Sequence, residues 1–149
     1  MAIKNLSTVA MIAIAIIGMF FTLTTAGLLS VNQSVPSSGT VTTVNVGVYL
    51  DSACTQTLTV IDWGTLSPGN SVTRTIYVKN TGSTTITLSM TKTDWNPTSA
   101  NGPISLNWNR ENTMLTTNAV TTATLTLSVS SSISGIATFS VNIVITGTG

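Results

Sequence analysis

From Val41 onward, apolar residues occupy every second position in one short run after another, and this alternation limits the fold most. Successive side chains of a strand point to opposite faces, so each run describes a strand with one apolar face. Seven such runs lie at 41–50, 58–63, 71–80, 85–91, 104–109, 123–129 and 137–146, with turn residues between them. The sequence therefore predicts a mainly β domain, a seven-stranded sandwich of the immunoglobulin type. An up-and-down barrel is the alternative architecture.

The chain is poor in the residues that carry most enzyme chemistry. Only 6% of its residues are charged, it has no histidine, and its net charge is +1. Histidine-based catalysis, histidine metal sites and a basic surface for nucleic acid are therefore excluded. The lone cysteine, Cys54, can form neither an internal disulfide nor a Cys-rich zinc site. The chain has four carboxylates, Asp51, Asp62, Asp94 and Glu111, and their spacing matches no calcium loop. We therefore expect no metal site, and we expect no cofactor and no enzymatic activity either.

Residues 1–30 form a separate apolar segment, and we expect a hydrophobic α-helix there. Lys4 is the last charged residue before Asp51, and the uncharged run Val9–Leu29 is long enough, as a helix, to span about 30 Å of bilayer. Lys4 would keep its own end in the cytoplasm and send the rest of the chain outward. Three interpretations stay open: a signal peptide cleaved after Ala26, a pilin-type leader that ends at Lys4-Asn5, and an uncleaved anchor.

Residues 31–40 are polar and contain Pro36 and Gly39, so we expect a linker before a domain at 41–149. Asn32 begins an Asn-Gln-Ser triplet, which makes it a candidate glycosylation site on the outside of the cell. The three expected parts are thus the helix at 1–30, the linker at 31–40 and the β-domain.

The solvent-facing positions of the strands carry threonine and serine where soluble sandwiches usually carry lysine and glutamate. Apart from Lys4, basic and acidic residues are equal in number, which indicates self-association. The same hydroxyls are candidate carriers of glycans. Trp63 and Trp95 border expected turns and are candidate contacts for a partner or a sugar, whereas Trp108 fits the core.

Two turn motifs link neighbouring runs. Gly64-Thr65-Leu66-Ser67-Pro68-Gly69 precedes one strand, and Asn80-Thr81-Gly82 follows it. This pair resembles a recurrent pattern of immunoglobulin-like surface domains. Pro-Gly closes a tight turn, and Asn-x-Gly tolerates a positive φ.

With Lys4 to Val9 at its start, the whole chain resembles archaeal type IV pilins and adhesive filament subunits. That resemblance implies a structural, self-assembling subunit that is held in the membrane before assembly and exposed at the cell surface afterwards. Its helices would form the filament core, its β-domains the outer sheath. Close helix packing is favoured by small residues, and the expected assembly positions are Leu6, Ala10, Ala13, Ala15, Gly18, Phe20, Phe21, Ala26 and Gly27.

Two further hypotheses remain. After cleavage at Ala26, the stretch from Gly27 to about Val48 would insert as a strand into a neighbouring copy, which predicts a vacant groove in the isolated sandwich. Alternatively, the chain is a membrane-anchored monomer that binds a sugar or an envelope protein through Trp63 and Trp95.

Overall fold

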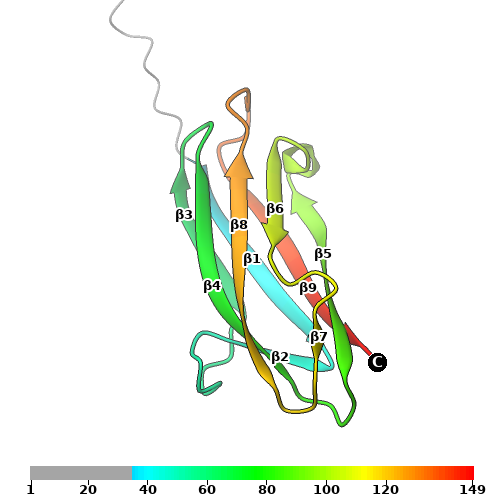
Figure 1. Ribbon diagram of the computed structural model, residues 1–149. Coiled ribbons are helices and arrows are strands. Elements are labelled where there is room, and N and C mark those ends of the chain that lie inside the picture. Colours follow the sequence, from blue (N-terminus) through cyan, green and yellow to red (C-terminus); the bar gives the residue numbers. More distant parts are fainter. Residues whose placement is uncertain (1–34) are drawn as a thin grey trace, which may run out of the picture. The chain divides into compact units, whose positions relative to one another are not determined.

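The computed structural model describes residues 35–149, and for residues 42–44 it describes the backbone alone. Most of these residues lie in strands (Figure 1). The elements are β1 (Val35–Val44), β2 (Val46–Tyr49), β3 (Val60–Leu66), β4 (Ser71–Asn80), β5 (Ile86–Asn96), the short 3-10 helix η1 (Thr98–Ala100), β6 (Ile104–Trp108), β7 (Met114–Leu115), β8 (Val120–Val129) and β9 (Phe139–Thr148). In this part of the chain, no helix is long and apolar enough to cross a bilayer. The prediction of a mainly β domain is confirmed.

The strands form two sheets. Sheet A has the order β3-β1-β9-β5-β7, and sheet B has the order β2-β4-β8-β6. Figure 1 shows β4, β8 and β6 in front of β1 and β9, so the two sheets lie as two layers. Neighbouring strands are antiparallel, with one exception: β1 runs parallel to β9. The first and the last described strands therefore lie side by side at the centre of sheet A.

The core lies between the sheets and follows the predicted alternation. On β8, Leu125 and Leu127 are buried, while Thr124 and Thr126, which alternate with them, are half-buried. Strand β9 shows the same pattern from Phe139 to Ile145. Burial of a large aliphatic side chain stabilises a fold by about 1.5–3 kcal/mol, so the packed inner faces hold the domain together without a disulfide.

The first described strand is longer than the sequence predicts. Residues 35–40, expected in the linker, belong to β1, and Val35 is fully buried. The run 41–50 is not one strand, because Asn45 adopts a positive φ of 59° and redirects the chain from sheet A to sheet B. Leu50 falls outside β2 and is 54% exposed. With this division and the two-residue β7, residues 35–149 contain nine strands, not seven.

Each of the two β-bulges of sheet A lies beside a tryptophan. Between the pairs Ser37↔Gly64 and Ser38↔Asp62 the register skips Trp63, and Gly64 adopts a φ of 76°. On β5 the register shifts between Thr93 and Asn96, where Asp94 has a φ of 53°. A bulge adds one residue to a strand and reverses the face that the next residues occupy. The turn residues that flank both tryptophans in the sequence therefore lie inside strands.

Candidate functional site

The predicted contact residues Trp63 and Trp95 are not surface residues. Trp63 is 1% exposed and Trp95 is 9% exposed, and the ring of Trp95 stacks on Phe139 with centroids 6.0 Å apart. The expectation that they border turns and face a partner is wrong: Trp63 shares the inward face of Ile61 on β3, and the bulge at Asp94 turns Trp95 inward on β5. Trp108, expected in the core, is only partly buried.

The other predicted site residues lie outside the described part of the chain. These are the assembly positions Leu6, Ala10, Ala13, Ala15, Gly18, Phe20, Phe21, Ala26 and Gly27, and the glycosylation candidate Asn32. The site that can be built from geometry is therefore the surface of the β-domain.

The carboxylates of this domain serve its own turns and strands. The carboxylate of Asp62 accepts a hydrogen bond from the Gly64 amide at 2.8 Å, and that of Asp94 accepts one from Asn142 Nδ2 at 2.7 Å. Glu111 Oε2 accepts hydrogen bonds from the Trp108 indole at 2.7 Å and from the Met90 amide at 3.2 Å. Within residues 35–149, acidic and cysteine side chains form no group of three that would suit a metal ion.

Asp51 closes the loop that follows β2. Its carboxylate accepts hydrogen bonds from the backbone amides of Gln56 and Thr55, at 2.7 and 3.0 Å, and from the Thr55 hydroxyl. The hydrogen bond from the Gln56 amide, followed by those from Thr55, lowers the pKa of Asp51 below its ordinary value of 3.8, since they favour the charged form. Cys54 lies in this loop, half-buried, as a free thiol.

Two cations bridge the sheets, one at each flank of the sandwich. Arg74 occupies an inward position on β4, between Val72 and Ile76, and its Nε donates to the Asp62 carbonyl of β3 at 2.9 Å. Lys92 continues the inward series of β5, and its Nζ donates to the Leu106 carbonyl of β6 at 3.0 Å. Inward-pointing charges at sheet edges oppose the addition of a foreign strand.

Loops add hydrogen bonds to three further strands. The 109–113 loop lies along β8 and β5: Arg110 Nε donates to the Thr122 carbonyl at 2.7 Å, and the Asn112 amide donates to the Leu88 carbonyl at 2.9 Å. On the other flank, the Leu58 amide donates to the Val48 carbonyl of the edge strand β2 at 2.8 Å. The flanks of the described domain are thus partly covered.

The outer face of sheet B is covered with hydroxyls. Ser71, Thr73 and Thr75 of β4 lie opposite Ser128, Thr126 and Thr124 of β8. Ser71 and Ser128 share a hydrogen bond of 2.7 Å. We call eight outward side chains of these two strands the hydroxyl face: Ser71, Thr73, Thr75, Tyr77, Thr122, Thr124, Thr126 and Ser128. The outward pair Lys79 and Val120 lies at its end, so the eight residues themselves include no charged side chain.

Two hollows lie beside β3. The larger, about 510 Å³, lies where the starts of β1 and β9 meet β3 and is lined by Ser37, Asp62 and Phe139 among others. The Ser37 hydroxyl and the Trp63 indole nitrogen are buried without a hydrogen-bond partner in the described residues. The smaller, about 230 Å³, is the apolar notch, built from Leu50, Leu58, Val60, Ile61 and Ile76 with Asp62, Arg74 and Thr75 around them.

Sequence reasoning missed the exposed apolar side chains. Among the side chains that the structure describes, four large hydrophobic ones are exposed: Leu50 at 54%, Val60 at 56%, Met114 at 71% and Val120 at 42%. The exposure of Met114 could have been predicted, because Met114 stands outside the alternating runs. Leu50 and Val60 gave no such signal, because each stands in or beside an alternating run.

Comparison with known proteins identifies no relative. No protein-family model matches the chain, and no match was found among curated proteins. The proposal therefore depends on the residues themselves: the hydroxyl face, the cations that bridge the flanks, and charged side chains that are engaged within the domain.

Proposed function

We propose that the chain is the structural subunit of an extracellular filament of the type IV pilus kind, with no catalytic role of its own. Residues 1–30 would form the helix that anchors the precursor and then packs in the filament core. The two-sheet domain, an immunoglobulin-like sandwich in this proposal, would form the outer surface and contact whatever the filament adheres to.

The proposal depends on one observation: the charged side chains of the β-domain are hydrogen-bonded within the domain. Seven of the eight charged side chains of residues 35–149 make a hydrogen bond within the domain, and Lys79 is the exception. The outer faces are left with hydroxyls and little charge to keep copies apart. Such a surface suits a protein that lives at high local concentration beside its own copies.

The decisive experiment is intact mass and N-terminal sequencing of the protein from its native cell surface, with electron microscopy of the same material. A chain that begins at Leu6, found in filaments, supports the pilus-type subunit. A chain that begins at Gly27 has lost the helix, and this model then fails. A retained Met1 without filaments indicates an anchored monomer. Additional mass in hexose-sized steps would identify glycans on Asn32 or on the threonines.

The position of β1 favours a second candidate, a filament built by exchange of strands. Residues 35–44 lie at the centre of sheet A, between β3 and β9, so their removal would open a groove through the sheet. In the described domain this groove is filled by the chain's own β1, not vacant. Assembly of this kind would therefore require each copy to exchange β1 with a neighbour, and it goes with a chain that begins at Gly27.

The anchored binding module loses its supporting feature. It was expected to use Trp63 and Trp95, and both rings are buried.

A further inference from the structure

The four exposed apolar side chains are distributed unevenly over the described domain. Leu50 and Val60 both line the apolar notch, which lies beside β3. Met114, the most exposed of the four, lies on β7. Strands β3 and β7 are the two outermost strands of sheet A. Single exposed hydrophobic residues are common and need no explanation, but here a hollow and a projecting side chain lie at opposite edges of one sheet.

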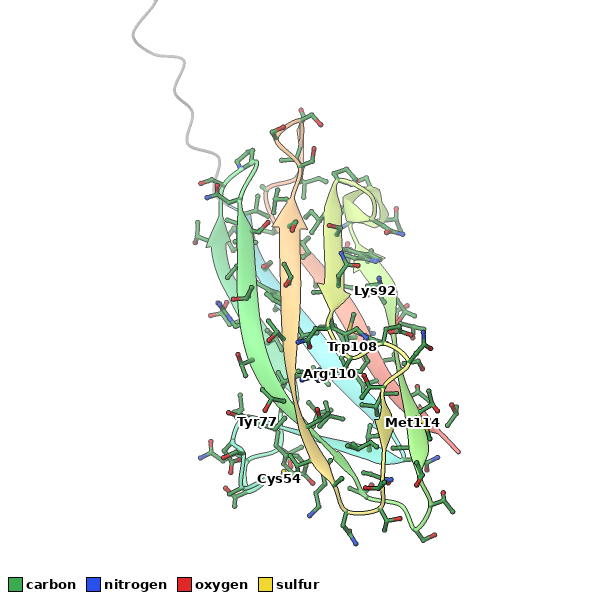
Figure 2. All side chains as sticks on the ribbon, in the orientation of Figure 1. Cys54, Tyr77, Lys92, Trp108, Arg110 and Met114 are labelled. Carbon is green, nitrogen blue, oxygen red and sulfur yellow. The ribbon has the colours of Figure 1, made fainter. Side chains whose placement is uncertain are left out.

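Figure 2 shows the two sides clearly, with Met114 on the side of the domain away from the loop that carries Cys54. That loop connects Leu50 to the Leu58–Val60 stretch, so it belongs to the notch side. Because the two features lie on opposite sides, one copy cannot fill its own notch with its own Met114. A second copy placed edge to edge can.

We propose that Met114 of one copy docks into the apolar notch of the next, so that the β-domains contact one another head to tail. This inference rests on the proposed filament and names the contact between its subunits. A projecting apolar side chain that fits a hollow elsewhere on the same molecule makes a heterologous contact, which repeats without closing and so generates a filament. Methionine suits such a contact, since its flexible side chain fills irregular hollows.

The charges on the two sides do not oppose the contact. Arg74 and Asp62 lie around the notch, and Arg110 and Glu111 lie on the loop just before Met114. Each side thus carries one cation and one anion, and all four groups make hydrogen bonds within their own domain. No excess of like charge therefore separates the copies at this contact. Lys79 is on the outward face of β4 and takes no part.

Strand addition at two of the edges is opposed. Arg74 and Lys92 each engage a carbonyl of an edge strand, Asp62 on β3 and Leu106 on β6, and they place a charge there. Docking of a side chain into the notch leaves all these hydrogen bonds intact.

The contact is too small to hold two free copies together. Stable interfaces bury about 1,200–2,000 Å², and one methionine with the rim of its notch covers a small part of that. The contact therefore forms where copies are already held at high effective concentration, as along a filament, and adds stability and register there.

The test is disulfide trapping between copies of the full chain, expressed in the cell that makes it. Cys54→Ser provides the parent, and electron microscopy checks first that it forms filaments. Val60→Cys and Met114→Cys are then combined in this parent, and surface material is mildly oxidised and run on a non-reducing gel. We expect a ladder of linked multimers, with about tenfold more product than the control pair Thr73→Cys with Met114→Cys, because a disulfide requires Cβ atoms about 4 Å apart.

Substitution without trapping provides a second readout. Met114→Gln and Val60→Gln should each make filaments shed or fragment more readily, whereas the matched control Val120→Gln should not. Filaments without the ladder, and unaffected by Met114→Gln, would overturn the docking contact and leave the proposed function standing. Absence of filaments from the unaltered chain would overturn both.

Discussion

At the scale of single residues, Asn80 shows how one amide holds a turn and two strands together. It is fully buried, and its Nδ2 donates to the carbonyls of Thr84 at 2.7 Å and Leu115 at 3.0 Å. Its Oδ1 accepts a hydrogen bond from the Gly82 amide at 2.8 Å. All the polar atoms of this side chain that can pair do so inside the domain.

Asn80→Ala should therefore lower the free energy of unfolding by about 3 kcal/mol, since it leaves buried carbonyls and an amide without partners. Urea unfolding of the full chain, followed by tryptophan fluorescence, measures the change. Asn107→Ala is the matched control, because Asn107 is exposed on β6, and it should change the stability by less than about 0.5 kcal/mol. Equal effects of the two substitutions would contradict the assigned role of Asn80.

Asp51 supplies a prediction about pH. Its folded pKa is lowered, chiefly by the Gln56 amide, so the charged carboxylate stabilises the 51–56 loop. That contribution is fully present above the unfolded pKa, near 3.8, and is lost as the pH falls through the lower folded value. An NMR titration should place the midpoint of Asp51 below 3.8, with the Gln56 amide resonance moving in step. A midpoint at or above that value would contradict the hydrogen bonds described.

The sequence predicted one of the two turn motifs correctly. The Ser67–Asn70 turn has Gly69 at a φ of 81°, and the Asn70 amide donates to the Ser67 carbonyl, as a Pro-Gly turn requires. The Asn80-Thr81-Gly82 motif was also read as a turn. Neither Asn80 nor Gly82 has a positive φ, however, and the burial of Asn80 depends on Leu115, which is distant in the sequence.

At the scale of elements, the flank bridges made by Arg74 and Lys92 are the feature most open to test. Arg74→Met and Lys92→Met should each cost about 1 kcal/mol of stability, because a hydrogen bond from a cation is lost at a partly exposed site. The larger effect should be on aggregation, since each change leaves an apolar residue at a sheet edge. Fibril formation after long incubation measures it.

Lys79→Met is the matched control for these two variants. It removes the same charge from β4, but Lys79 points away from the core and makes no hydrogen bond in the described domain. If all three variants aggregate alike, loss of charge alone is responsible and the bridges are not edge guards.

Strand β1 offers a prediction about its own placement. A Cβ at Gly39 would lie 3.1 Å from Ile143 Cδ1 and 3.3 Å from Trp63 Nε1, so a larger side chain fits only if these neighbours move. Gly39→Val should cost about 1–3 kcal/mol through overpacking. Thr40→Val, one residue on and exposed, should cost much less. Similar thermal unfolding of the two variants would contradict the close packing of Gly39 against Ile143 and Trp63.

Alternation predicted which strands exist but not how they bend. The inner faces of β5, β8 and β9 were correct because period two is a local property. The bulges at Trp63 and Trp95 were missed, since Gly64 and Asp94 are equally compatible with turns when the partner strand is unknown. Pairing of β1 with β9 was also beyond local patterns, because those strands lie at opposite ends of the described chain.

For the whole molecule, the balance of charge decides how copies of this domain can meet. Residues 35–149 carry four cations and four anions, and all of them except Lys79 make hydrogen bonds within the domain. Any association between copies must then depend on packing of neutral surfaces, with exposed ion pairs contributing little.

Association should accordingly be nearly independent of salt. Between about 0.01 and 1 M NaCl the Debye length falls from about 30 Å to about 3 Å, which would change an assembly held by charges by orders of magnitude. We expect the amount of filament recovered by sedimentation to change by less than about threefold over this range. A steep decrease with salt would mean that the Arg74, Asp62, Arg110 and Glu111 side chains dominate the contact, and a steep increase that apolar burial far larger than one notch does. A flat response is what a neutral hydroxyl-covered surface with one small apolar contact requires.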